Sequence, residues 1–227
     1  MKKLKVVIPA RGGSKGVPGK NIKKINNIPL IGYPILAAQK AKLISDIYVS
    51  TDDNAIAAVA KEYGAKVIIR PDDLAKDDSL DIDVMRHAVN YLDDINDIVH
   101  LRATTPMIES NLLDQAIEFF YNNIQCTSLR SGHEAPETAY KWFKREDKYW
   151  LGLFNNEFDG EYYNWPRQKL PKTYQANGYI DILKPLQFMN NSLHGDKMLS
   201  FITPYSHEVD TIDDFNILGA IYGKHNA

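Results

Sequence analysis

Strand-like and helix-like segments alternate from the start of this chain to about residue 130, and this alternation restricts its fold more than any other feature. Short apolar runs are each followed by a segment with apolar residues at helical spacing. The expected strands are 5–9, 44–50, 67–69, 98–101 and 126–129, and the expected helices are 30–42, 54–63, 81–92 and 110–121. Parallel strands joined by right-handed helical crossovers fit this series. We therefore predict an α/β chain of three layers, with a mostly parallel sheet and helices on both faces.

The alternation stops after Ser131. Segment 133–171 is rich in aromatic, charged and turn residues, which predicts irregular structure and short antiparallel strands. So many aromatic side chains need a covering surface. We expect either an arm that packs on a second subunit or a local cluster packed on its own sheet. Strands at 179–183 and 200–204 and a helix at 213–222 complete a single domain, 1–227, in which range 132–198 contains the expected subdomain.

A Gly-rich basic loop follows the first expected strand. It contains Ala10, Arg11, Gly12, Gly13, Ser14, Lys15, Lys20 and Asn21. Glycines let backbone N–H groups approach phosphate oxygens closely, and the cations neutralise them. The loop lacks both the Gly-Lys-Ser/Thr ending of a P-loop and the spacing G-x-G-x-x-G. Ligands of open α/β sheets bind at the carboxyl ends of strands, so a polyphosphate site is favoured over a flexible surface loop.

Polar residues also follow later strands, at 51–53 and 102–106, and should share one edge of the sheet with the loop. Arg70 ends a strand too; an arginine there is more often a surface residue than a ligand, unless it faces this edge. Arg167 offers a planar fork for a carboxylate or phosphate. Asn177-Gly178 precedes a strand and is expected to be a turn.

An acidic segment near the C-terminus offers metal ligands. Glu208 and Asp210 are two residues apart, so on an extended backbone both side chains point to the same face. Two hard oxygen ligands beside a phosphate loop suit Mg²⁺. Asp213 and Asp214 follow them and are expected to cap the last helix instead.

Composition excludes several other classes of protein. The formal net charge is -2, so no global basic field points to nucleic acid. The single cysteine, Cys126, excludes an intramolecular disulfide, is expected to be buried and fits a reducing cytoplasm. The start is basic but its apolar run breaks at Pro9, so no signal peptide is expected. No uninterrupted apolar stretch approaches the length of a membrane span. The histidines show no zinc spacing, and His87 and His100 are expected at element surfaces.

Together and in this order, the motifs resemble those of the acylneuraminate cytidylyltransferases, the CMP-sialic acid synthetases and their CMP-nonulosonate relatives. The resemblance covers nearly the whole chain, in segments 8–16, 20–21, 49–53, 70–71 with 74–75, 104–106, 166–168, 177–178 and the late acidic pair. It implies a Rossmann-like nucleotidyltransferase fold with a small dimerisation subdomain. It also implies that CTP and an acidic nine-carbon keto sugar give a CMP-sugar and pyrophosphate, by in-line attack of the anomeric hydroxyl on the α-phosphorus.

The resemblance also implies roles for particular residues and a homodimer whose middle segment reaches the neighbouring subunit. The nucleotide site would comprise Ala10, Arg11, Gly12, Gly13, Ser14, Lys15, Lys20, Asn21, Arg70 and Asp210; the sugar site Arg102, Thr104, Lys141, Arg167, Gln168 and Asn177; and the Mg²⁺ ligands Glu208 and Asp210. Among these, Arg11, Lys15, Lys20 and Asp210 are the expected catalytic residues.

Two departures from the family pattern affect these expectations. The usual Asp-Ile-Asp is here Glu208-Val209-Asp210, so the longer Glu208 would bind metal through water or from a shifted backbone. The usual Gln-Pro-Thr-Ser-Pro-Leu-Arg begins here with Arg102 and ends with Ile108. Because Arg102 is close to the expected sugar site, a relative of sialic acid such as legionaminic acid is at least as plausible as N-acetylneuraminic acid.

Two other functions stay open from the sequence. One is a nucleotidyltransferase of the same fold that uses GTP or another nucleotide and a sugar 1-phosphate. The other is a catalytically silent nucleotide-binding protein. The hypothesis of a sugar 1-phosphate substrate is disfavoured by Lys141, Arg167 and the acidic pair, which favour an acidic keto sugar. The hypothesis of a catalytically silent protein is disfavoured by the complete set of loop cations and carboxylates.

Overall fold

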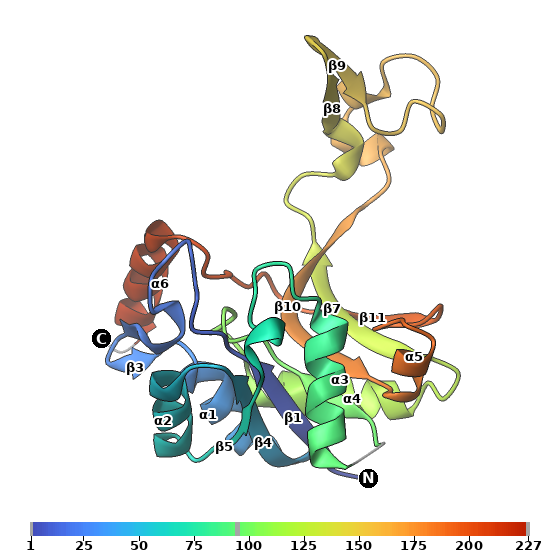
Figure 1. Cartoon of the computed structure of the whole chain (residues 1–227). Helices are drawn as coiled ribbons and strands as arrows, with labels where there is room; N and C mark the ends of the chain where they lie inside the picture. Colours follow the sequence, from blue (N-terminus) through green and yellow to red (C-terminus); the bar gives the residue numbers. More distant parts are fainter. Residues whose placement is uncertain (1, 94–95, 226–227) are drawn as a thin grey trace.

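Seven strands form one sheet, in the order β11-β7-β10-β6-β1-β4-β5, in a computed structural model that describes residues 2–93 and 96–225 (Figure 1). Their bounds are β1 (Leu4–Pro9), β4 (Ile44–Thr51), β5 (Lys66–Ile69), β6 (Ile98–His100), β7 (Ser128–Glu134), β10 (Tyr174–Leu183) and β11 (Met198–Ile202). All ladders are parallel except the two that β10 makes with β6 and β7. The predicted mostly parallel α/β sheet is confirmed.

The order of the strands places a binding crevice beside β1. The chain passes from β1 outward to β4 and β5, then returns to the other side of β1 with β6. In open α/β sheets, ligands bind outside the carboxyl ends of the strands where the order reverses in this way. The residues that follow β1, β5 and β6 therefore meet at one edge.

Helices cover both faces of the sheet, as predicted. Helices α1 (Gly32–Lys40), α2 (Asn54–Glu62) and α4 (Ser110–Tyr121) pack on one face, and α3 (Asp81–Leu92) and the short α5 (Leu186–Met189) pack on the other. Strand β1 alternates accordingly, since Val6 and Ile8 belong to the first core and Val7 to the second. Three layers result, with β1 buried in the centre.

The opening loop is held by a third, smaller core. After the 3-10 turn η1 (Lys20–Ile22), the short strands β2 (Lys24–Ile25) and β3 (Ile28–Pro29) form a hairpin next to helix α6 (Ile212–His225). Val17 from the loop packs there with Val209 and with Phe215 of α6. This contact brings the start of the chain to the late acidic segment.

Most element bounds agree with the sequence prediction, and α3 and α4 agree at both ends. The larger differences are in β7 and β10. β7 starts at Ser128 and runs to Glu134, and β10 starts at Tyr174 instead of 179. These extensions pair with each other, with Tyr174 opposite Glu134, as a ribbon that leaves the sheet. Their polar composition gives no alternating apolar signal, which is why the sequence did not reveal them.

The expected turn at Asn177-Gly178 is wrong, because both residues lie inside β10. The register of β10 against β7 shifts between Ala176 and Asp181, and Gly178 has a φ of 61°. A residue in the left-handed region within a strand marks a bulge, which glycine adopts without steric cost. The Asn-Gly signal was real, but it marks a bulge and not a strand connection.

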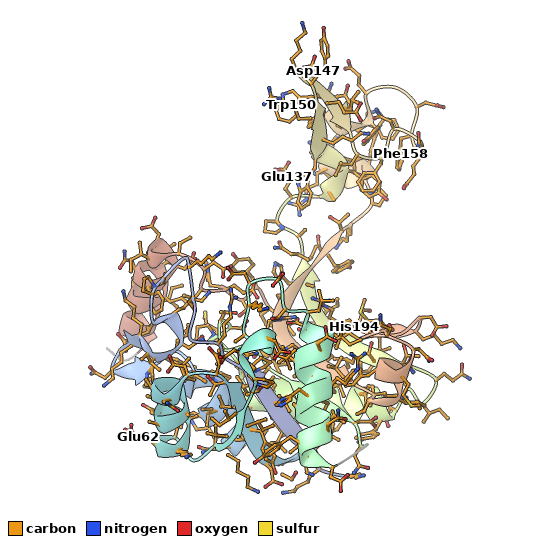
Figure 2. All side chains as sticks on the ribbon, in the orientation of Figure 1. Glu62, Glu137, Asp147, Trp150, Phe158 and His194 are labelled. Carbon is orange, nitrogen blue, oxygen red and sulfur yellow. The ribbon has the colours of Figure 1, made fainter. Side chains whose placement is uncertain are left out.

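An arm projects from the body at the end of this ribbon (Figures 1 and 2). It contains the hairpin β8 (Phe143–Glu146) and β9 (Tyr149–Gly152) and the 3-10 turns η3 (Ala139–Lys141), η4 (Tyr162–Asn164) and η5 (Arg167–Lys169). The short antiparallel strands predicted for 133–171 are confirmed. Inside the arm, Tyr162 is buried and its hydroxyl accepts a hydrogen bond from Phe154 N at 2.7 Å.

Only part of the aromatic segment packs within the arm. Tyr140 stacks on Phe154 with ring centroids 4.3 Å apart, which confirms a local cluster. Trp142 and Trp150 stay 49% and 67% exposed. The arm thus presents apolar surface that this chain does not cover. Among the described residues, no helix is long and apolar enough to cross a membrane.

Candidate active site

A cavity of about 440 Å³ lies at the carboxyl ends of β1, β5 and β6. The predicted site residues that line it are Ala10, Arg11, Ser14, Lys15, Lys20, Asn21, Arg70, Arg102, Thr104 and Asp210. Gly12 and Gly13 belong to the same loop but do not line the cavity. Residues from both ends of the chain therefore meet in one composite site.

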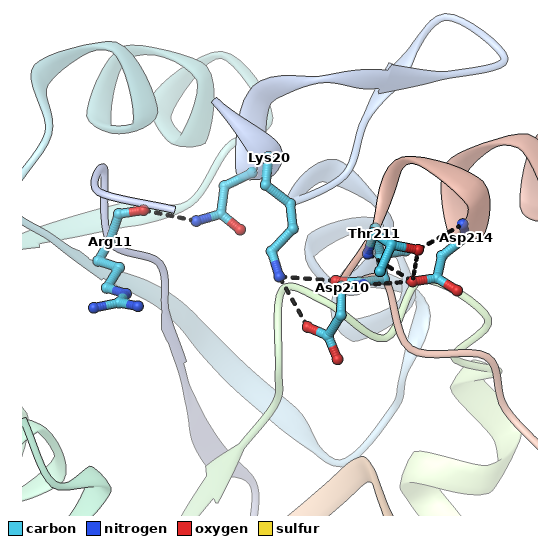
Figure 3. Close-up of polar contacts among 7 residues, drawn as sticks. Arg11, Lys20, Asp210, Thr211 and Asp214 are labelled. Carbon is cyan, nitrogen blue, oxygen red and sulfur yellow. Dashed lines mark hydrogen bonds and ion pairs between the residues drawn. The ribbon is translucent and has the colours of Figure 1, made fainter. Parts of the chain in front are cut away.

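The backbone of the opening loop is fixed by neighbouring polar groups. Gly12 N donates to Asp52 Oδ1 at 3.2 Å, and a Cβ at Gly12 would lie 2.6 Å from Asp53 Oδ2. Asn21 is buried, and its Nδ2 donates to Arg11 O at 2.9 Å (Figure 3). Asn21 thus lines the cavity and holds the loop at the same time.

Two cations of the loop are paired with Asp77, which follows the 3-10 turn η2 (Asp72–Leu74). Arg11 Nη1 lies 2.6 Å from Asp77 Oδ1, and Lys15 pairs with the other carboxylate oxygen. Hydrogen bonds from Lys15, and then from Arg11, hold the pKa of Asp77 below its ordinary value. The sequence analysis assigned no role to Asp77, because the pairing joins segments far apart in the chain.

Lys20 connects the loop to the late acidic segment (Figure 3). Its Nζ donates to Val209 O at 2.8 Å and to Asp210 Oδ1 at 3.1 Å. A Cβ at Gly16 would lie 2.5 Å from Asp210 O, so the two backbones are in close contact. Val209 N also donates to Thr104 O at 2.9 Å, which joins the same segment to the residues after β6.

Asp214 stabilises the start of α6, as expected for a capping residue. Its Oδ2 accepts from Thr211 N at 2.7 Å, and Asp214 N donates back to Thr211 Oγ1 at 3.3 Å, which is a capping box. The carboxylate also accepts from Asp210 N at 2.9 Å. Although burial alone would raise its pKa, these hydrogen bonds hold the pKa of Asp214 below its ordinary value.

Glu208 and Asp210 are close enough to interact. Burial, and then the charge of Asp210, raise the pKa of the Glu208 carboxyl. Among the described residues no group of three or more histidine, cysteine or acidic side chains could hold a metal ion. Two carboxylates that repel each other beside a cationic loop do fit Mg²⁺, which commonly takes one or two carboxylates and completes its shell with substrate oxygens and water.

Arg70 is a cavity residue and not a surface residue. Its side chain is only 4% exposed, and its Nη2 lies 3.6 Å from Asp52 Oδ1. Asp52 also accepts from Gly12 N, so a single carboxylate links Arg70 with the opening loop. Arg70 therefore faces the edge of the sheet at which the sequence analysis allowed a ligand role.

Arg102 belongs to a group of charged and titratable residues that we name the Arg102 cluster. Asp81, His100 and Arg102 line the cavity, and Arg130, Asp181 and His194 lie behind them. Arg102 Nη1 lies 3.1 Å from Asp81 Oδ2, and its Nη2 lies 3.6 Å from Asp181 Oδ2. His100 is 2% exposed, so its expected surface position is wrong: β6 is a central strand that places it between β1 and β10.

Burial controls ionisation in the Arg102 cluster. It lowers the pKa of His100 to about 3 and, with the charge of Arg130, lowers the pKa of His194 to about 4. It raises the pKa of Asp181 to about 6, against the opposing charges of Arg130 and Arg102. The sequence carried one signal for this cluster that we did not use, an aspartate in the otherwise apolar strand segment 179–183.

The remaining predicted sugar residues lie outside this cavity. Arg167 and Gln168 line a second cavity, of about 280 Å³, at the base of the arm, and Lys141 lies in η3. Asn177 is buried, with its Nδ2 2.6 Å from Thr203 Oγ1 and 3.2 Å from His133 Nδ1. The structure thus brings together the nucleotide set with Arg102 and Thr104, and separates them from the arm residues.

A scan of protein families gives a match that spans most of the chain. Residues 5–169 match the family described as Cytidylyltransferase. This chain belongs to the cytidylyltransferase family. It is therefore a nucleotidyltransferase enzyme, as the family resemblance of its motifs implied.

Three relatives of this cytidylyltransferase have names that refer to different substrates or processes. It is 31% identical to the post-translational flagellin modification protein B of Campylobacter coli, over 100% of this chain and 97% of that protein. It is 34% identical to a pseudaminic acid cytidylyltransferase of Campylobacter jejuni, over 76% and 74%. It is 28% identical to the N-acylneuraminate cytidylyltransferase of Escherichia coli, over 99% of this chain but only 53% of that enzyme.

A solved structure confirms the fold of this cytidylyltransferase. The CMP:2-keto-3-deoxy-manno-octonic acid synthetase in complex with CTP superimposes with a TM-score of 0.74 over 99% of this chain and 100% of that chain. The sequence identity is 16%, so this likeness concerns the fold alone.

Proposed function

We propose that this cytidylyltransferase transfers CMP from CTP to the anomeric hydroxyl of a nonulosonic acid of the sialic or legionaminic acid type and releases pyrophosphate. The observation that carries the proposal is the single cavity that joins Arg11, Lys15 and Lys20 to Asp210. A triphosphate needs such cations, and a second substrate that attacks the α-phosphorus must lie beside them. Relatives named for sialic and pseudaminic acids support an acidic sugar as that substrate.

The loop residues would bind and orient the triphosphate. Arg11 and Lys15 would exchange Asp77 for phosphate oxygens, and Ser14 would donate its hydroxyl. Lys20, whose side chain is only 14% exposed, would stay anchored to Val209 O and neutralise charge near the α-phosphorus. These groups act by positioning and by stabilising developing charge.

Glu208 and Asp210 would hold Mg²⁺. When bound, the ion supplies positive charge for the phosphate oxygens and lowers the pKa of a coordinated hydroxyl. Asp210 is suited to this role, because Asp214 fixes its backbone and its side chain, which lines the cavity, is 71% exposed. Asp210 would leave Lys20 for the ion.

The sugar site would be shared between two copies of the chain. Arg102 and Thr104 line the cavity from within the chain, whereas Lys141, Arg167 and Gln168 lie on the arm. The exposed aromatic residues of the arm are suited to contact a second subunit, since aromatic side chains are enriched at interfaces. A homodimer would bring the arm of one copy to the cavity of the other, and with it cations for the sugar carboxylate.

The test is pyrophosphate release by the purified protein with CTP and Mg²⁺. The sugars are N-acetylneuraminic, legionaminic and pseudaminic acids. A parallel panel pairs GTP with glucosamine 1-phosphate. We expect turnover with CTP and at least one nonulosonic acid. Turnover in the GTP panel alone, or CTP binding without pyrophosphate release, would contradict the proposal.

A pair of variants makes this test specific to the acidic segment. Asp210→Ala should lower kcat by about 100-fold or more, the scale of losing a major electrostatic contribution. Asp213→Ala is the control, because Asp213 is exposed in the first turn of α6, three residues after Asp210, and does not line the cavity. Equal effects of the two substitutions would contradict the assignment of Asp210.

A further inference from the structure

The bulge of β10 supports two side chains of the candidate site. A Cβ at Gly178 would lie 2.5 Å from Arg102 Cδ and 2.7 Å from Glu208 Oε1, so both side chains pack against the backbone of this glycine. The ladder of β10 with β7 shifts its register between Ala176 and Asp181. Bulges often lie next to active sites, where they redirect side chains. Whatever holds this bulge in shape therefore also determines where Arg102 and Glu208 lie.

The side chain of Asn177 holds the bulge through three hydrogen bonds. Its Oδ1 accepts from Tyr179 N at 3.3 Å, across Gly178. Its Nδ2 donates to Thr203 Oγ1 at 2.6 Å and lies 3.2 Å from His133 Nδ1. His133 belongs to β7, and Thr203 directly follows β11. The amide thus joins the bulge of β10 to the neighbouring strand and to the segment that leads to the acidic residues.

All the hydrogens of the Asn177 amide have partners within the protein. Tyr179 N can only donate, so it faces the amide oxygen. Thr203 Oγ1 gives its own proton to Pro204 O at 3.0 Å, and it therefore accepts one amide proton. The second amide proton is directed at His133 Nδ1, and burial lowers the pKa of His133, which keeps that nitrogen available as an acceptor. Asn177 has no donor left for a ligand.

Asn177 is also out of reach of the two cavities. Its residue is only 2% exposed, and it lines neither the cavity with Arg102 nor the cavity with Arg167. Buried polar groups whose hydrogen bonds are all made give a local structure one defined arrangement. The contacts of Asn177 thus suit a residue that orients its neighbours.

A second route connects the same residues to the acidic segment. Beyond Thr203, the ring of Tyr205 packs edge-on against His133, with centroids 4.8 Å apart, and against His207, with centroids 4.7 Å apart. Glu208 follows His207 directly. The group around Asn177 therefore touches Glu208 from the bulge and also holds the backbone that carries it.

We propose that Asn177 is a positioning residue, which holds the bulge at Gly178 and the segment after β11 and thereby places Glu208 and Arg102 for the reaction. The inference rests on the proposed function for the role of Glu208 as a metal ligand. It replaces the role that the family resemblance implied for Asn177, a direct contact with the sugar. Glu208 has one more rotatable bond than the usual aspartate, so its packing on the bulge restricts a side chain that would otherwise be less well ordered.

The experiment measures the dissociation constant of CTP by calorimetry, with and without Mn²⁺ as the metal probe. The ratio of the two constants is the metal-dependent gain, which should be at least about ten-fold for the wild-type protein. Asn177→Ala and Thr203→Val should each remove most of this gain, because losing a residue that orients a metal ligand typically costs about 10- to 100-fold in metal affinity. The dissociation constant without Mn²⁺ should stay within about two-fold, since the opening loop is distant from both substitutions.

Two controls separate positioning from stability. Thr203→Ser keeps the hydroxyl that accepts from Asn177, so it should retain the gain that Thr203→Val loses. Asp114→Ala removes a carboxylate that accepts from Lys42 N at 3.0 Å and Leu43 N at 2.8 Å, just before β4 and thus at the opposite edge of the sheet from the cavity. It should lower the free energy of unfolding and leave the gain unchanged. Thr203→Val preserves the size of its side chain, which keeps the test decisive where Asn177→Ala does not fold.

Steady-state kinetics with Mg²⁺ distinguish positioning from direct contact. The sugars are N-acetylneuraminic, legionaminic and pseudaminic acids. A residue that places a metal ligand affects kcat, whereas a residue that only binds the sugar affects its KM. A raised sugar KM in Asn177→Ala, with normal kcat and an unchanged metal-dependent gain, would overturn the inference and return Asn177 to the sugar site. An equal loss of the gain in Asp114→Ala, or a wild-type protein whose CTP affinity does not depend on Mn²⁺, would also overturn it.

Calorimetry needs no sugar, so the inference and the proposed function can fail separately. A wild-type protein that turns over no nonulosonic acid, but whose metal-dependent gain is lost in Asn177→Ala and kept in Thr203→Ser, would overturn the proposed function and support the positioning role. Turnover of a nonulosonic acid at the same kcat by the wild-type protein and by both site variants would overturn the positioning role and leave the proposed function in place.

Discussion

Gly178 is the residue on which the side chains of Arg102 and Glu208 both pack. Its φ of 61° costs a residue with a Cβ roughly 1–2 kcal/mol, and a Cβ would displace Arg102 and Glu208 as well. We therefore predict that Gly178→Ala lowers kcat/KM by about 100-fold, more than its loss of stability explains. Steady-state kinetics and urea unfolding on the same preparation measure both effects.

Gly160 provides the matched control for this prediction. Its φ is 67°, close to that of Gly178, and a Cβ there would meet nothing within 4 Å. Gly160→Ala should show a similar loss of stability and nearly normal kinetics. If both variants have the same activity, Gly178 is needed only for its backbone conformation.

His194 makes stability depend on pH. Arginine can only donate, so the contact from Arg130 at 3.3 Å requires an unprotonated Nε2. Burial and Arg130 lower the pKa to about 4, against 6.5 in the unfolded chain. Between these values only the unfolded chain binds the proton, so this contribution to stability is complete above pH 6.5 and is lost as the pH falls toward 4.

The predicted outcome is a smaller acid-induced loss in His194→Gln than in the wild-type protein. Glutamine keeps an acceptor for Arg130 and does not titrate. Urea unfolding at pH 7.5 and pH 5 gives the free energy of unfolding for both proteins. The raised pKa of Asp181 acts in the opposite direction but is common to both, so it cancels in the comparison. An identical pH dependence would show that His194 is solvated.

The sequence predicted those site residues that lie together in one short segment of recognisable composition. Arg11, Lys15 and Lys20 lie within one loop of recognisable composition, and Asp210 lies in a short acidic pattern. The sequence analysis assigned no role to Asp77 or Asp181 and placed His100 wrongly at a surface, because each of these residues has its partners far away in the sequence. Burial and ion pairing between distant segments produce no periodic pattern in the amino-acid sequence.

At the scale of elements, the segment between η2 and α3 contacts the opening loop. Asp77 from this segment pairs with both Arg11 and Lys15, so it would compete for the same donors with the triphosphate of the proposed reaction. We predict that Asp77→Asn increases the affinity for CTP by a few-fold, a small effect because exposed ion pairs are weak. Calorimetry with CTP in the presence of Mg²⁺ measures it.

The neighbouring residue gives the control for this prediction. Asp78→Asn removes the same charge at an exposed position that has no ion pair with the loop among the described contacts. Comparison of the two variants at low and high salt separates a local pairing from a general change in charge. Weaker CTP binding in Asp77→Asn would instead assign Asp77 a role in arranging the loop cations.

Prediction of the elements succeeded where one periodicity extends over a full helix or buried strand. Helices α3 and α4 have apolar residues on one face throughout, and their bounds were predicted at both ends. It failed for the ribbon of β7 and β10, where polar residues continue the strands and Gly178 forms a bulge. Pairing between strands, which no single segment encodes, defines these elements.

At the scale of the whole molecule, the separation of Arg167 from the cavity has a direct consequence. Asp210 lies in the cavity of the body and Arg167 at the base of the arm. If one site takes its body from one subunit and its arm from the other, two defective chains can complement each other. A heterodimer of Asp210→Ala and Arg167→Ala would contain one site with both residues intact.

Mixing therefore tests the shared site. Each variant alone should be nearly inactive, and an equal mixture, dissociated and reassociated, should recover about a quarter of the wild-type activity, because half of randomly paired dimers are mixed and each has one intact site of two. Sedimentation velocity on the same samples establishes the dimer, and wild-type protein carried through the same procedure controls for losses. A mixture that stays as inactive as its components, in samples shown to be dimeric, would place the arm of each chain over its own cavity.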